Sequence, residues 1–249
     1  MYQALYRKWR PKVFSEVVGQ EHITDTLRRQ VAEGHTAHAY LFTGTRGTGK
    51  TTCARILAKA VNCLSPVDGE PCGRCEACRA VDAGTTLDIT ELDAASNNGV
   101  DQVRALREEA VYTPAVLKKR VYIIDEVHML STPAFNALLK ILEEPPEHLM
   151  FILATTELHK VPATILSRCQ RFSFKRILPR DMERQLLHIA QAESIDLTAD
   201  GAEILSRMAG GALRDALSLL DQCRVAEGQL TSRAVLDVLG PVSYTHLTL

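Results

Sequence analysis

A short apolar run, Ala39-Tyr-Leu-Phe-Thr43, is followed at once by the segment Gly44-Thr-Arg-Gly-Thr-Gly49-Lys50-Thr51. This segment fits the pattern G-x-x-x-x-G-K-[ST] and precedes a stretch with helical spacing. Glycines let backbone N–H groups curl around phosphate oxygens, the lysine can reach β- and γ-phosphates, and the threonine hydroxyl can ligate Mg²⁺. At average residue frequencies, a chance match somewhere in the chain has a probability of about one in a hundred. The sequence therefore predicts a nucleotide phosphate loop between a strand and a helix.

Further apolar runs alternate with helical spacing through the first two-thirds of the chain. They lie at 87–92, 121–124 and 150–154, and they are typical of a parallel α/β sheet covered on both faces. Between the last two, an apolar helical face begins after Ser131, a good N-cap, and ends at Pro145-Pro146.

The pattern changes near residue 178. Helical spacing without strand spacing follows at 181–193, 198–209, 212–227 and 231–239. We therefore predict an α/β domain over residues 1–178 and a helical domain over 179–240. The 249 residues, 46% of them hydrophobic, suffice for two cores. No apolar run reaches 18 residues and no secretory signal begins the chain, so we expect a cytoplasmic, reducing compartment and no membrane partner.

Polar residues follow two of the expected strands. Asp125 would position Mg²⁺, and Glu126 would polarise the attacking water, as hydrolysis at a phosphate loop requires. Thr155 and Thr156 end the next strand, where a hydroxyl could bond the γ-phosphate or the water; a capping threonine is the alternative. Because carboxyl ends of parallel strands meet at one edge, we expect these residues near the loop.

Two arginines are candidate partners of a γ-phosphate. Arg168, in Ser167-Arg168-Cys169, is either an ordinary ion-pair residue or an arginine finger. Arg214 begins a helix of the second domain and could reach the nucleotide from there when the domains close.

Four of the seven cysteines share the spacing C-x₈-C-x₂-C-x₂-C: Cys63, Cys72, Cys75 and Cys78. This spacing suits tetrahedral Zn²⁺ better than an iron–sulfur cluster, and a reducing compartment disfavours disulfides. Four thiolates leave no position for a catalytic water, and a helix from Lys50 to about Val61 would place the cluster roughly 16–18 Å from the phosphates. The zinc is therefore expected to be structural, and Cys53, Cys169 and Cys223 are expected to be ordinary thiols.

The net charge is −1, so any DNA contact must come from local patches or from several subunits together. Two acid-free basic patches are candidates, although solvated faces are the alternative. They comprise Arg7, Lys8, Arg10 and Lys12, and then Arg168, Arg171, Lys175, Arg176 and Arg180.

In this order, the motifs resemble the bacterial DNA polymerase III gamma/tau family, the ATPases of the replicative clamp loader. The segments that carry the resemblance are RKWRP at 7–11, FSEVVGQEH at 14–22, GTRGTGKT at 44–51, DAAS at 93–96, DEVHML at 125–130, FNALLKILEEPPEH at 135–148, LATT at 153–156, ILSRC at 165–169 and LRDALSL at 213–219, together with the four cysteines.

The resemblance implies an AAA+ fold: a five-stranded parallel sheet domain, a zinc module at about 62–82 and a three-helix lid. It implies Walker B at Asp125 and Glu126, sensor 1 at Thr155, a finger for a neighbour's ATP at Arg168 and sensor 2 at Arg214. Arg10 and Val18 would lie near adenine. Walker A would comprise Gly44, Thr45, Arg46, Gly47, Thr48, Gly49, Lys50, Thr51 and Thr52. The implied cofactors are ATP, Mg²⁺ and Zn²⁺.

The implied partners are other clamp-loader subunits (delta, delta prime and further gamma/tau copies), the sliding clamp and primer–template DNA. A non-hydrolysing stator like delta prime is the alternative, and a branch-migration motor is disfavoured by the zinc insert. Residues 241–249 match neither the family nor a helical period, and we expect a non-native tail there. Family members carry a collar domain at this point, so we expect this chain to be mostly monomeric.

Overall fold

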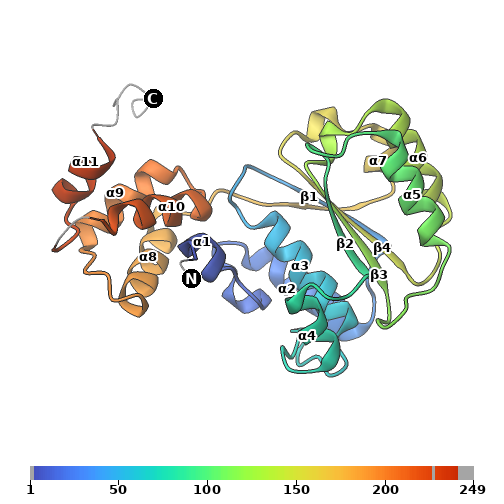
Figure 1. Ribbon diagram of the computed structural model, residues 1–249, viewed down its shortest axis with the longest axis horizontal. Helices are drawn as coiled ribbons and strands as arrows, with labels where there is room; N and C mark the ends of the chain where they lie inside the picture. Colours follow the sequence, from blue (N-terminus) through green and yellow to red (C-terminus); the bar gives the residue numbers. More distant parts are fainter. Residues whose placement is uncertain (1–2, 226–227, 241–249) are drawn as a thin grey trace.

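The computed structural model describes residues 3–225 and 228–240 of the chain. Five parallel strands form one sheet in the order β2-β3-β4-β1-β5 (Figure 1). The strands are β1 (Ala39–Thr43), β2 (Ile89–Asp93), β3 (Arg120–Asp125), β4 (Leu149–Thr155) and β5 (Gln170–Ser173). The sheet domain is thus a five-stranded parallel α/β domain, as predicted.

The expected strands all form, with small shifts at their ends. The run predicted at 87–92 begins instead at Ile89, because Asp88 turns its buried carboxylate onto the loop at 115–117 and Leu87 is exposed. β5 was not evident from its residues, since only Phe172 of its four is buried. Its register next to β1 completes the sheet.

Helices cover both faces of the sheet (Figure 1). On one face α2 (Glu21–Glu33) and α3 (Lys50–Asn62) form a core with Phe42, Ile123 and Ile152. On the other face lie α5 (Val100–Ala110), α6 (Thr132–Glu143) and α7 (Ala163–Leu166). Alternate strand residues therefore enter opposite cores. In the described part of the chain, 3-10 turns also link the elements: η1 (Phe14–Glu16), η2 (Val127–Met129) and η3 (Leu158–Lys160).

The predicted start of α6 is confirmed. Ser131 caps the helix by accepting a hydrogen bond from Ala134 N–H, and Pro133 lies in the first turn. Phe135, Leu138 and Leu142 are buried against the sheet.

The second domain is all helical, as expected from the spacing after residue 178. In the described residues it comprises α8 (Pro179–Ala192), α9 (Ala199–Ala209), α10 (Leu213–Cys223) and α11 (Ser232–Leu239). These helices share one core, which includes Met182, Leu205, Leu220 and Val235. The expectation of a non-native tail concerns residues 241–249, which lie outside the described part of the chain.

The first helix of the chain, α1 (Leu5–Lys8), packs with the lid rather than with the sheet domain. Leu5 is fully buried in the lid core, and its N–H donates to Asp221 on α10. Trp9 donates its indole N–H to Glu193 at the end of α8. The first described residues therefore pack against the helical unit, while the predicted 1–178 boundaries stay a prediction.

Within the described residues, no helix is both long and apolar enough to cross a membrane.

Candidate nucleotide site

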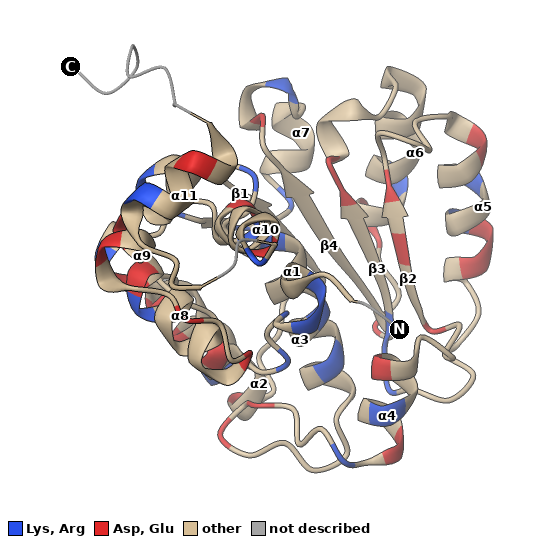
Figure 2. Cartoon of the chain, turned by 60° about the vertical axis from the view of Figure 1, so that its left-hand side comes forward, with Lys and Arg blue, Asp and Glu red and all other residues tan. Residues whose placement is uncertain are grey.

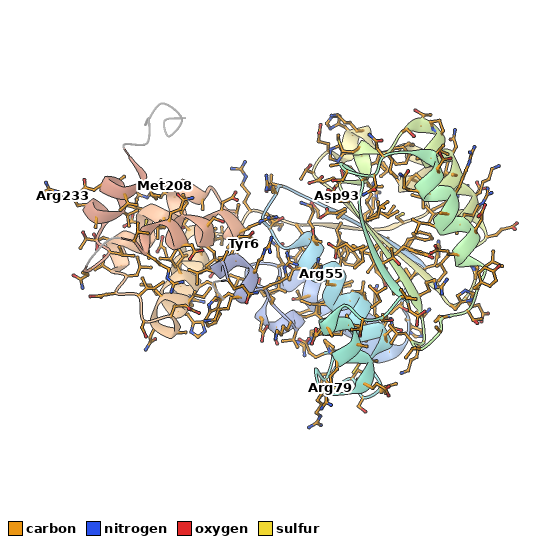
Figure 3. All side chains as sticks on the ribbon, in the orientation of Figure 1. Tyr6, Arg55, Arg79, Asp93, Met208 and Arg233 are labelled. Carbon is orange, nitrogen blue, oxygen red and sulfur yellow. The ribbon has the colours of Figure 1, made fainter. Side chains whose placement is uncertain are left out.

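A cavity of about 430 Å³ opens between the carboxyl edge of the sheet, the N-terminal segment and the lid. Figure 3 shows Tyr6 on α1 beside the helical lid, Arg55 on α3 of the sheet domain, and Asp93 at the end of β2. The predicted residues that line the cavity are Arg10, Val18, Arg46, Gly47, Thr48, Gly49, Lys50, Thr51, Thr52, Asp125, Glu126 and Arg214.

The loop before α3 has a backbone that only glycine tolerates at several positions. Gly44 and Gly47 both have positive φ angles, and a Cβ on Gly44 would lie 2.4 Å from Phe174 O. A Cβ on Gly47 would lie 2.7 Å from Ala212 Cβ, where the lid meets the loop. No side chain caps α3 at Gly49, so the first N–H groups of this helix remain available to an anion.

Lys50 is folded back onto its own loop. Its Nζ donates to Gly44 O at 2.8 Å and to Thr45 O at 2.9 Å. These two loop residues do not line the cavity, but their carbonyl oxygens hold the lysine that does. Burial lowers the pKa of Lys50, while the carboxylates of Glu126 and Asp125 partly offset this effect. A cation in such a site is well placed to bind phosphate.

Two oxygen ligands meet at the start of α3. Thr51 Oγ1 donates to Asp125 Oδ2 at 2.6 Å. A hydroxyl and a carboxylate beside a phosphate loop are the hard oxygen donors that Mg²⁺ prefers, so these residues fit the ion. Figure 2 shows the acidic residues at the carboxyl ends of β2 and β3.

Glu126 occupies a strained turn. Its φ of 47° is left-handed, a conformation that costs a non-glycine residue of the order of 1–2 kcal/mol. The turn is supported by Glu126 N–H, which donates to Asp125 Oδ1 at 2.9 Å. Thr156 donates to Glu126 Oε2 from its hydroxyl at 2.9 Å and from its N–H at 3.2 Å.

The cysteine cluster lies at the opposite end of α3. The four Sγ atoms are all within 4.8 Å of one another, and Cys63 Sγ and Cys75 Sγ are 3.9 Å apart. Tetrahedral zinc with Zn–S bonds of about 2.3 Å requires S···S separations near 3.8 Å, so the cluster fits Zn²⁺. Backbone N–H groups of Cys72, Cys75 and Cys78 donate to cluster sulfurs, as thiolates require.

The pKa values within the cluster are uneven. Burial works to raise the pKa of Cys75, but N–H donation from Leu64 and Cys78 and contacts with neighbouring thiols lower it to about 6.

α4 (Glu76–Ala83) begins at the cluster, and Figure 3 places its Arg79 far from Asp93. The cluster is therefore remote from the nucleotide cavity.

The sequence profile described as "DNA polymerase III, delta subunit" matches residues 19–177, and "DNA polymerase III clamp loader subunit, ATPase lid domain" matches residues 181–229. The DNA polymerase III subunit tau of Bacillus subtilis is 53% identical over 99% of this chain, and that of Escherichia coli is 49% identical over 96%. The chain belongs to the DNA polymerase III gamma/tau family. It spans 44% and 37% of the lengths of these two relatives.

Solved structures agree on the fold of this gamma/tau-family chain. The Holliday junction branch migration motor RuvB of Thermotoga maritima superposes with a TM-score of 0.67 at 20% identity, over 93% of this chain and 72% of that one. The lid profile covers α8, α9 and α10, and α11 follows it.

Besides Gly44 and Thr45, Thr155 and Arg168 are the predicted nucleotide-site residues of the gamma/tau-family chain that lie outside the cavity lining. Thr155 is fully buried, and its hydroxyl contacts His128 Nδ1 at 3.0 Å and Glu157 N–H at 3.0 Å. It is Thr156 that bonds Glu126. Arg168 is also elsewhere: its guanidinium contacts Glu143 at 2.9 Å.

Four residues near the gamma/tau nucleotide site were not predicted from the sequence: Tyr6, Trp9, Asp93 and His128. Asp93 ends β2 as Asp125 ends β3, so the rule for strand ends could have found it. Tyr6 and Trp9 gave no signal, because their place depends on the docking of α1 against the lid.

Proposed function

We propose that this chain is the ATP-binding and ATP-hydrolysing part of a clamp-loader subunit, which acts with its partners to load a sliding clamp onto primed DNA. The observation that carries the proposal is the convergence of Lys50, Thr51, Asp125 and Glu126 on one cavity beneath Arg214 of the lid. These groups supply what phosphoryl transfer to water needs: phosphate binding, metal ligation and a base.

Each of these four residues has a separate role in hydrolysis. Lys50 leaves its loop carbonyls to bind β- and γ-phosphates, and backbone N–H groups at the start of α3 bind the remaining oxygens. Thr51 and Asp125 would hold Mg²⁺, which supplies charge neutralisation between phosphates. Glu126 accepts the proton of the attacking water.

The adenine and the γ-phosphate are bound by residues of the N-terminal segment and the lid. Burial lowers the pKa of Arg10, and the nearby charge of Arg55 lowers it further, so an anionic ligand would relieve this crowding. Arg10 and Val18 line the part of the cavity next to the N-terminal segment, which suits adenosine. Arg214 is the sensor 2 residue that reads the γ-phosphate.

Arg168 is proposed to act on a neighbouring subunit. It does not line this chain's cavity and is held near the surface by Glu143, a position that suits delivery to another chain. In a complete loader, mixing Arg168→Ala subunits with unaltered partners should reduce hydrolysis at the adjacent subunit's site. Loss confined to the altered subunit's own site would contradict this role.

Zinc is proposed as a structural ion. Four thiolates close its coordination shell, and α3 separates the cluster from Lys50 by about 18 Å, from 1.5 Å per residue. Other loader subunits, the sliding clamp and primer–template DNA are the proposed partners. The exposed Arg171, Lys175, Arg176 and Arg180 are candidate DNA contacts.

Titration calorimetry with Mg-ATP tests the proposal. The unaltered chain should bind one ATP, and Lys50→Ala should weaken binding by about tenfold or more, because charged hydrogen bonds to phosphate are lost. Lys140→Ala, an exposed change on α6, is the matched control and should bind normally. Equal affinity for Lys50→Ala and the control would overturn the site. Binding without any hydrolysis would favour the stator alternative.

A further inference from the structure

A buried histidine lies behind the proposed catalytic base. His128 is on η2, directly after the Glu126 turn, and its side chain is 6% exposed. Its Nδ1 is 3.0 Å from Thr155 Oγ1 and 3.3 Å from Glu126 Oε2, and its Nε2 is 3.2 Å from Glu157 Oε1. His128 does not line the nucleotide cavity. It therefore contacts the hydrolytic machinery from the protein side only.

The Glu157 carboxylate fixes the direction of one contact of His128. A carboxylate can only accept, so Nε2 carries the hydrogen that faces Glu157. The Thr155 hydroxyl accepts from Glu157 N–H at 3.0 Å and lies 3.0 Å from His128 Nδ1, which also faces Glu126 Oε2 at 3.3 Å. The imidazole thus fixes the Thr155 hydroxyl and the Glu157 carboxylate at once.

Thr156, the residue directly after β4, contacts the proposed catalytic base. Thr156 N–H and its hydroxyl both donate to Glu126 Oε2. Glu126 Oε1 has no hydrogen-bond partner among the described residues. One oxygen of the carboxylate is thus anchored, and the other is available to accept a proton from water.

We propose that His128 is a positioning residue for hydrolysis: by holding Thr155, it fixes the end of β4 from which Thr156 anchors Glu126. The inference rests on the proposed ATPase function and assigns His128 no contact with substrate. Loss of His128 should therefore lower the rate of hydrolysis and leave ATP affinity unchanged.

Three substitutions of His128 distinguish the roles of its two ring nitrogens. His128→Asn places an amide near Nδ1 and keeps the contact with Thr155, whereas His128→Gln places it near Nε2 and keeps only the contact with Glu157. His128→Leu fills the space without hydrogen bonds. Because the chain of contacts to Glu126 runs through Nδ1, Asn should retain most of the rate, and Gln and Leu should lose about tenfold to a hundredfold.

The test measures single-turnover ATP hydrolysis, ATP affinity and the midpoint of thermal unfolding for each variant. His159→Asn is the matched control, since this histidine is 76% exposed and its Nε2 lies 3.7 Å from Glu157 Oε2. Unaltered hydrolysis in His128→Leu would overturn the inference. So would equal rate losses in Asn and Gln accompanied by weaker ATP binding, which indicate a structural role. If Leu fails to fold, the Asn and Gln pair decides.

The same measurements separate this inference from the function on which it rests. An unaltered chain that binds ATP but never hydrolyses it would overturn both. An unaltered chain that hydrolyses ATP, with a His128→Gln variant equally fast, would overturn only the role of His128.

Discussion

Thr51 and Asp125 are 74 positions apart in the chain, yet Thr51 Oγ1 donates to Asp125 Oδ2 across 2.6 Å. The contact joins the first turn of α3 to the carboxyl end of β3, and so places a hydroxyl and a carboxylate side by side. Since both groups are already in position, metal binding needs little rearrangement of the chain.

Removal of the Thr51 hydroxyl should therefore weaken nucleotide binding only when Mg²⁺ is present. Thr51→Val keeps the shape and loses the ligand, whereas Thr51→Ser keeps the ligand. We expect about tenfold weaker Mg-ATP binding in Val and near-normal binding in Ser, measured by calorimetry with Mg²⁺ or with EDTA. A similar loss of affinity in EDTA would show that the hydroxyl does not act through the metal.

The guanidinium of Arg214 packs against the aromatic ring of Tyr6. Its Cζ lies 5.0 Å from the centroid of Tyr6, which is close enough for a cation–π contact. Arg214→Ala should weaken ATP binding by about tenfold, because a charged contact with the γ-phosphate is lost, while ADP binding should change little. Competition binding with both nucleotides checks this, and an equal loss for ATP and ADP would exclude γ-phosphate recognition.

Chelation should remove one zinc per chain. Cys75→Ser should lower the zinc content measured by mass spectrometry and lower the thermal midpoint, because the insert loses its metal cross-link. Cys169→Ser is the control: burial raises the pKa of this thiol to about 12, and it lies outside the cluster. ATP affinity should survive in both variants, and zinc retained by Cys75→Ser would contradict the assignment.

Asp88 should make the free energy of unfolding depend on pH in the acid range. Burial works to raise its pKa, but N–H donors from Leu117, Ala115 and Val116 and the charge of Arg120 outweigh burial and lower the pKa overall. The carboxylate therefore stabilises the fold above its unfolded pKa of about 3.9, and this contribution is lost as pH falls through the folded pKa.

Urea unfolding of Asp88→Asn measures this contribution. The variant should lose about 1–3 kcal/mol at pH 7, because buried N–H donors keep a weaker acceptor. The difference from the unaltered chain should shrink as the pH falls below about 4. A difference that stays constant down to pH 2 would argue against the carboxylate's charge as its source.

Local patterns made the phosphate loop and the acidic strand end predictable from the sequence. Lys50 and Thr51 follow a glycine-rich turn, and Asp125 follows an apolar strand, so residue order alone places them. The choice between Thr155 and Thr156 could not be made this way. Thr155 ends β4 and Thr156 directly follows it, so only the position of Glu126 shows which hydroxyl meets it.

Long-range docking was the other limit. Leu5 lies in the lid core and its N–H contacts Asp221, 216 positions away, and no local spacing encodes such a pairing. β5 could not be predicted for a different reason. An edge strand with one buried residue shows no alternation of apolar and polar residues in its sequence.

The most direct test of the central claim is single-turnover hydrolysis of ATP by the unaltered chain and by Glu126→Gln. Glutamine preserves the shape of the side chain and can still accept from Thr156, but it cannot take a proton from water. The account expects equal ATP affinity in the two chains and hydrolysis at least about a hundredfold slower in Glu126→Gln. Equal hydrolysis rates, or no hydrolysis by the unaltered chain, would contradict it.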